Sequence, residues 1–146
     1  MSQGKNSPES RAALSRDIRA ATGLDEAVLE RLIRAFYARA RIDPQIGHMF
    51  AGVADWEHHV ARITSFWASA VLQAGTYQGQ PLPPHFKLGV QPEHFARWLV
   101  LFEQTALEEC TGSAVMLLMD KARMIARGMQ MGLAVARGEM PARFGM

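Results

Sequence analysis

Residues 56 to 67 read WEHHVARITSFW, and this stretch indicates a helix that buries one face. Its apolar side chains recur at every third or fourth position, which is the repeat of an amphipathic α-helix. Because successive residues of an α-helix point about 100° apart, two adjacent histidines face different surroundings. We expect His58 to face solvent and His59 to face inward with Ile63 and Phe66. The stretch therefore places one imidazole among buried apolar residues.

The same helical repeat appears on both sides of this stretch. We expect helices from Pro8 to about Ala21, from Asp25 to the stop at Asp43-Pro44, from Asp55 to Gly75, from Pro92 to the break at Gly112-Ser113, and from there to near Gly138. No segment alternates between apolar and polar residues as a strand does, and no internal repeat is present. The fold class is therefore all-α.

The first of these helices carries a thinner apolar stripe than the others. Only Leu14, Ile18 and Ala21 contribute to it. We therefore expect residues 1–24 to form an N-terminal extension with a short helix, and residues 25–146 to form one domain. A chain of this length is large enough to bury a core of its own.

Composition and charge are those of an ordinary globular protein. Hydrophobic residues make up 49% of the chain and charged residues 21%, with a formal net charge of +2. The apolar runs are too short to cross a membrane, and the polar start MSQGKNSPES lacks the apolar stretch of a signal peptide. Arginines near the N-terminus alternate with acidic residues, which is typical of a solvated helix face and not of a nucleic-acid surface. Because Cys110 is the single cysteine, no internal disulfide forms, and we expect a cytoplasmic location.

A long irregular segment follows the helix that contains His59. It runs from Gly75 to Gln91 and begins GTYQGQPLPPHFKL, residues 75 to 88. Connections of this length are uncommon in compact domains and usually have a function or are mobile. Its three prolines restrict the backbone on the N-terminal side of His85. The segment is either a plain connector or a frame that holds this imidazole in one place.

Three polar side chains lie on apolar helix faces. Tyr37, His59 and Trp98 come from three different expected helices. A buried phenol, imidazole or indole needs a hydrogen-bond partner for its polar atom. The three groups either satisfy one another inside the core or converge on a small polar ligand, and the pattern leaves both possibilities open.

Aromatic and aliphatic residues surround these polar groups in the expected fold, and His85 stands opposite them. The expected lining consists of Phe36, Phe50, Ile63, Phe66, Trp67, Phe95, Trp98 and Phe102. A flat apolar cofactor with a central metal needs such a pocket, and neutral imidazole is a common axial ligand of haem iron.

Four blocks of the sequence resemble the truncated haemoglobins of group III, in their order, spacing and residues. The blocks are FYARARIDPQIGHMF (36–50), WEHHVARITSFW (56–67), YQGQPLPPHFKL (77–88) and FARWLVLFE (95–103). The resemblance covers about residues 25 to 135, and the chain has no adjacent glycines, whereas groups I and II typically carry Gly-Gly pairs. It implies a truncated globin, a two-over-two helical sandwich around haem b in which a loop replaces most of the proximal helix.

The resemblance also implies roles for individual residues. His85 matches the proximal ligand of the haem iron, and Tyr37, His59 and Trp98 match the polar groups on the distal side. Arg62 is placed to reach a haem propionate. The residues expected to line the haem cavity are Phe36, Phe50, Ile63, Phe66, Trp67, Phe95 and Phe102.

The function implied is the binding of dioxygen, carbon monoxide, nitric oxide or peroxide at a five-coordinate iron. Strong distal donors slow oxygen release, which favours redox chemistry on nitric oxide or peroxide over oxygen transport. A nitric oxide dioxygenase or a peroxidase-like enzyme would need an external reductant, supplied by an unidentified reductase. The alternatives are a gas sensor or oxygen store without turnover, and a helical interaction domain without a cofactor.

Overall fold

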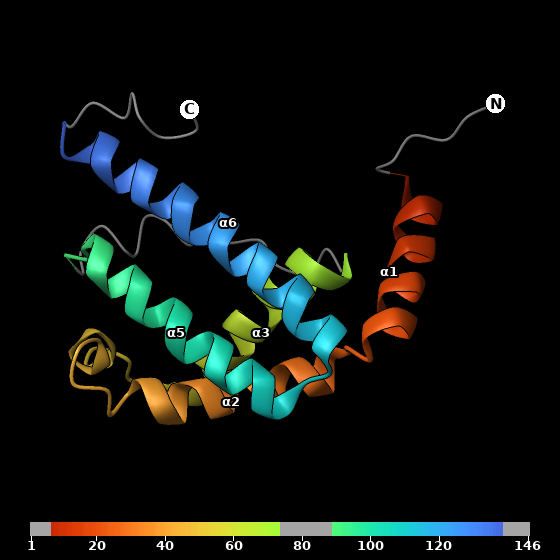
Figure 1. Ribbon diagram of the computed structural model, residues 1–146, viewed down its shortest axis with the longest axis horizontal. Coiled ribbons are helices and arrows are strands. Elements are labelled where there is room, and N and C mark those ends of the chain that lie inside the picture. Colours follow the sequence, from red (N-terminus) through yellow and green to blue (C-terminus); the bar gives the residue numbers. More distant parts are fainter. Residues whose placement is uncertain (1–6, 74–88, 139–146) are drawn as a thin grey trace.

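The computed structural model describes residues 7–73 and 89–138, and Figure 1 shows them as helices joined by short turns. The elements are α1 (Pro8–Thr22), α2 (Glu26–Ala40), the 3-10 helix η1 (Gly47–Phe50), α3 (Trp56–Leu72), α5 (Pro92–Glu109) and α6 (Gly112–Ala136). The described residues contain no strand, so the predicted all-α class is confirmed. None of the helices in these two ranges combines the length and apolar character needed to cross a membrane.

Short polar side chains start most of these helices. Ser7, Asp25, Asp55 and Thr111 each accept a hydrogen bond from the backbone N–H three residues further on, at 2.8 to 3.2 Å. Each such cap stabilises its helix by about 1 kcal/mol, because it satisfies an amide that the helix itself leaves unpaired. The predicted starts after Ser7 and Asp55 are therefore confirmed.

Two predicted boundaries are wrong by a few residues. Helix α3 ends at Leu72 and not at Gly75, because Gln73 takes a left-handed backbone conformation, with φ of 60°, and its N–H bonds to the carbonyl of Ala68. Gly75 lies outside the described residues. Helix α6 already includes Gly112, since Thr111 caps it, so the break after α5 is shorter than predicted.

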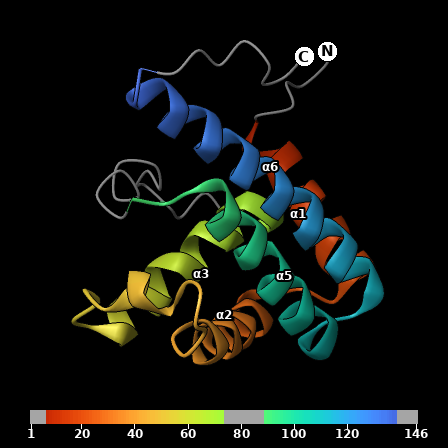
Figure 2. The same ribbon diagram turned by 60° about the vertical axis from the view of Figure 1, so that its left-hand side comes forward.

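The helices pair into two layers. Helix α2 packs against α3 and α5, and α5 also packs against α6. Figure 2 shows α2 with α3 as one layer and α5 with α6 as the other. This arrangement confirms the predicted two-over-two sandwich.

The core lies between the layers, where the apolar stripes of four helices meet. Leu29 and Ile33 of α2, Leu72 of α3, Phe102 of α5 and Leu118 of α6 are all almost completely buried. Burying a side chain of this size contributes about 1.5–3 kcal/mol of hydrophobic free energy. This core holds the four helices that surround the cavity described below.

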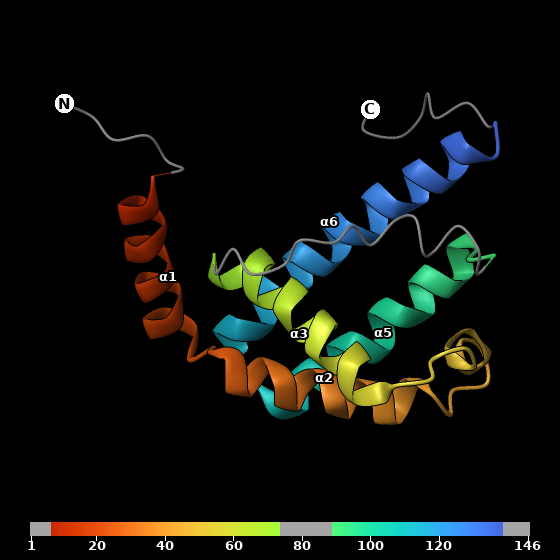
Figure 3. The same ribbon diagram turned by 180° about the vertical axis from the view of Figure 1, so that it is seen from behind.

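Helix α1 stands to one side of the sandwich, as Figures 1 and 3 show. Its C-terminal end is attached to the start of α6: the hydroxyl of Thr111 donates to the carbonyl of Thr22 at 2.7 Å, and that of Ser113 donates to the carbonyl of Ala21 at 3.0 Å. Thr22 is the one buried residue of α1. The division into an extension, residues 1–24, and a domain, residues 25–146, stays a prediction.

Candidate functional site

A cavity of about 210 Å³ opens between the two layers. All eleven predicted site residues in the described part of the chain line it: Phe36, Tyr37, Phe50, His59, Arg62, Ile63, Phe66, Trp67, Phe95, Trp98 and Phe102. They come from α2, η1, α3 and α5. The structure thus brings together side chains up to 66 positions apart in the sequence, while the roles assigned to them stay predictions. His85 lies outside the described residues.

The phenol of Tyr37 and the imidazole of His59 meet in the cavity. Tyr37 Oη lies 3.1 Å from His59 Nε2, within hydrogen-bond distance, and the two ring centroids are 5.0 Å apart. Burial raises the pKa of Tyr37, while the positive charge of Arg62 acts in the opposite direction. The phenol therefore keeps its proton at neutral pH and remains able to donate a hydrogen bond.

Aromatic stacking fixes the position of Trp98, the third predicted polar group of the cavity. Its ring stacks on Phe102 at 5.5 Å, and Phe102 stacks in turn on Trp67 at 4.9 Å. Phe36 meets both Trp98 and Phe102 edge-on, at 6.4 and 5.7 Å. This frame connects α2, α3 and α5, and the indole of Trp98 itself is in contact with Phe36 of α2 and Phe102 of α5.

Polar groups are few in the cavity lining, and one of them is a cation. Arg62 lies on α3 three residues after His59, lines the cavity and is itself exposed. His58, the neighbour of His59, faces solvent as predicted. The site is thus a mostly apolar cavity with hydrogen-bonding groups inside it and the positive charge of Arg62 where the cavity meets solvent.

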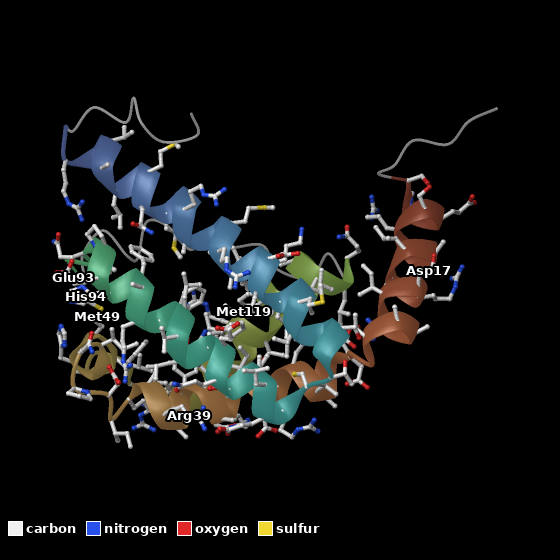
Figure 4. The ribbon with its side chains drawn as sticks, in the orientation of Figure 1. Asp17, Arg39, Met49, Glu93, His94 and Met119 are labelled. Carbon is white, nitrogen blue, oxygen red and sulfur yellow. The ribbon has the colours of Figure 1, made fainter. Side chains whose placement is uncertain are left out.

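His94 also lines the cavity, although the sequence pattern did not single it out for this position. It sits in the first turn of α5, and its Nδ1 accepts the backbone N–H of Gln91 at 2.9 Å. The ring of His48 on η1 lies 5.9 Å away, and Figure 4 shows His94 next to Met49 of the same short helix. A capping pattern of Gln-x-x-His at a helix that opens with proline was the available signal.

Six apolar lining residues were missed as well: Ile33, Ile46, Met49, Val90, Ile125 and Met129. Ile33, Ile125 and Met129 lie on the apolar stripes of their helices, so the helical repeat predicts that they face inward. The repeat does not distinguish a residue packed in the core from one that lines a cavity. The other three lie outside the long helices, where no repeat exists.

An ion pair with a buried carboxylate joins two elements that line the cavity. Asp43 Oδ1 accepts hydrogen bonds from Arg97 Nε and Nη2 at 3.0 and 2.7 Å, and Asp43 Oδ2 accepts from the backbone amides of Gln45 and Ile46 at 3.0 and 3.2 Å. The guanidinium of Arg97 is the main reason why the pKa of Asp43 lies below its usual value. The pair ties the turn that leads into η1 to helix α5.

Known proteins are similar to this chain in both sequence and fold. No family model matches the chain. The group 3 truncated hemoglobin ctb of Campylobacter jejuni is 33% identical over 113 residues, which cover 73% of this chain and 89% of that protein. The crystal structure of a group III truncated hemoglobin from Campylobacter jejuni matches with a TM-score of 0.69 and 34% identity, over 75% of this chain and 91% of that one. With this identity over most of the relative's length and the same helical sandwich, the chain belongs to the group III truncated haemoglobins, a family of haem globins that bind small gaseous ligands.

Proposed function

We propose that the cavity holds haem b and that the protein performs redox chemistry on nitric oxide or peroxide, not oxygen transport. One observation carries the proposal: Tyr37 and His59 form a polar pair in a cavity whose other walls are mostly aromatic and aliphatic. An apolar slot suits a flat porphyrin, and polar groups at one point of it suit a small ligand with partial negative charge.

The described side chains fit haem without supplying its axial ligand. His94 is a poor candidate, because Nδ1 accepts the Gln91 amide and the neutral ring must then carry its proton on Nε2, leaving no free lone pair. His59 is engaged with Tyr37. We therefore propose that His85 would bind the haem iron, as the family resemblance implies, and that Arg62 would contact a propionate. Bound haem would supply the iron that takes the small ligand and exchanges electrons with it.

The chain's own residues would hold and polarise that ligand. Either Tyr37 Oη or His59 Nε2 can be the donor of the hydrogen bond that joins them. When His59 Nε2 carries the proton and donates it, the phenol O–H of Tyr37 is left to donate into the cavity. Trp98, on helix α5, would donate its indole N–H. Hydrogen bonds to a charged acceptor contribute about 1.5–3 kcal/mol each. Two such bonds would slow the release of oxygen, which favours reaction over delivery.

Turnover requires an electron source outside this chain. Conversion of nitric oxide consumes one nitric oxide, one dioxygen and one electron and releases one nitrate ion. Reduction of peroxide to two water molecules consumes two electrons and two protons. We propose that an unidentified reductase supplies these electrons.

Visible absorption spectra of the purified protein test the cofactor first. We expect a Soret band that shifts on reduction and again with carbon monoxide, and no band after addition of haemin would contradict the proposal. Nitric oxide consumption by the reduced, oxygenated protein, with nitrate measured as product, then tests the reaction. Ligand binding with no turnover under a supply of reductant would identify a sensor or store instead.

A further inference from the structure

Trp56 stands behind the wall of the cavity and does not line it. It is the first residue of α3, and it is half-buried. Its ring centroid lies 5.4 Å from that of Tyr37 and 5.5 Å from that of His59, with interplanar angles of 61° and 79°. Both contacts have the edge-to-face geometry that aromatic rings prefer. One indole that does not line the cavity therefore touches both members of the polar pair.

Arg41 covers this indole. The residue follows the last turn of α2, and its Cζ lies 4.1 Å from the centroid of the Trp56 ring. At this distance the guanidinium is attracted by the electrons of the ring face. Phe50 lies 6.4 Å from the same indole, so side chains from α2 and η1 hold it in place. A series of side-chain contacts thus leads from the exposed Arg41 through Trp56 and His59 to Tyr37 in the cavity.

We propose that Trp56 is a positioning residue for the Tyr37–His59 pair and that Arg41 holds Trp56 in that position. Trp56 and His59 are three residues apart on α3 and share one side of the helix. The imidazole cannot turn away from Tyr37 on this side without displacing the indole. The phenol ring of Tyr37 meets Trp56 and Phe50 edge-on in the same way, each at 5.4 Å, which restricts its movement on that side. The consequence for a bound ligand depends on the function proposed above, whereas the effect on the pair itself does not.

The Fe–CO stretching bands of the carbon monoxide complex test the proposal, because their frequencies report hydrogen bonds to the ligand. In Trp56→Ala we expect the parent's bands to split or to move toward weaker donation, and oxygen to dissociate several-fold faster. Trp56→Phe, which keeps an aromatic ring, should recover most of the parent pattern. Arg41→Gln, which removes the charge and keeps a long side chain, should shift the bands in the same direction as Trp56→Ala but less.

Val71→Ala is the matched control. Val71 lies on the same helix, is 1% exposed and does not line the cavity, so its truncation destabilises the fold without touching the polar pair. Its Fe–CO bands should equal those of the parent. The proposal is overturned if Trp56→Ala keeps the parent's bands, or if Val71→Ala changes them as much as Trp56→Ala does.

A second readout needs no haem. The ¹⁵N chemical shifts of the His59 ring report the hydrogen bond with Tyr37, and Tyr37→Phe provides the reference for its loss. We expect Trp56→Ala to move these shifts toward the Tyr37→Phe values and Val71→Ala to leave them unchanged. Should the chain take up no haem, the proposed function fails, and these shifts alone then decide whether Trp56 positions the pair.

Discussion

Arg97 on α5 and Asp43 in the turn before η1, 54 positions apart, form an ion pair between two elements that line the cavity. The carboxylate is almost fully buried, whereas the guanidinium keeps 30% of its side chain exposed. The second carboxylate oxygen bonds the backbone amides of the turn that leads to η1. The carboxylate of Asp43 therefore binds the backbone of this turn with one oxygen and Arg97 of α5 with the other.

Replacing Asp43 with asparagine should lower the free energy of unfolding at neutral pH by about 1–2 kcal/mol, through the loss of charge-assisted hydrogen bonds. The pKa of Asp43 is lowered in the folded protein, mainly by Arg97. Its contribution to stability is therefore complete above the ordinary aspartate pKa of about 3.9 and is lost as the pH falls through the lowered value. Urea unfolding across acidic pH should show a shallower pH dependence in the variant.

A paired control separates this contribution from that of any surface carboxylate. Asp120 lies 3.8 Å from Arg123 in an exposed pair. Asp120→Asn should change stability by less than about 0.5 kcal/mol, because solvent screens such pairs. Equal losses of unfolding free energy in Asp43→Asn and Asp120→Asn would show that the pair of Asp43 and Arg97 stabilises the fold no more than an exposed pair does.

Replacing Tyr37 with phenylalanine should speed oxygen dissociation by about tenfold or more. The phenol is expected to contribute about 1.5–3 kcal/mol to holding the ligand, and 1.36 kcal/mol corresponds to a tenfold change in rate. Stopped-flow measurement of oxygen release checks this, with haem content measured in the same samples. An unchanged rate at full haem content would remove Tyr37 from the ligand's hydrogen bonds.

Replacing His85 with alanine should abolish stable haem binding or leave a spectrum that added imidazole restores. The reason is that neutral imidazole is the proposed axial ligand, and a cavity left by its removal admits free imidazole. Absorption spectra with and without imidazole provide the measurement. A variant with the parent's spectrum would show that another residue binds the iron.

Replacing His94 with alanine should lower the free energy of unfolding by about 1 kcal/mol, because the backbone N–H of Gln91 loses its acceptor at the start of α5. His94→Gln should retain most of that stability, since glutamine accepts the same hydrogen bond in a capping box. Thermal unfolding of the two variants measures the difference. Both should keep the parent's haem spectrum, and its loss in both would make His94 the axial ligand in place of His85.

The helices could be predicted because their causes are local. Asp55 caps α3 within three residues, and the apolar stripe that follows repeats within each turn. The end of α3 could not be predicted in the same way. A left-handed residue closes it, and that residue is Gln73. Local preference favours glycine at such a position, so the pattern placed the end of the helix too late.

The cavity could be predicted in part. Tyr37, His59 and Trp98 were identifiable, because polar side chains on apolar stripes need partners. His94 was not, since its capping bond with Gln91 looks like an ordinary helix start. Trp56 was recognisable as part of the apolar stripe of its helix, but its cation–π contact with Arg41 depends on how α2 meets α3.

By itself, the sequence determined the helical class, the helix starts and the set of side chains able to build an apolar pocket with polar groups. These follow from repeats and caps that act within one or two turns. Only the tertiary structure decided that Tyr37 Oη lies 3.1 Å from His59 Nε2, that Trp56 backs this pair and that Asp43 meets Arg97. Such contacts join residues far apart in the chain, and they depend on the relative placement of whole helices, which no local repeat specifies.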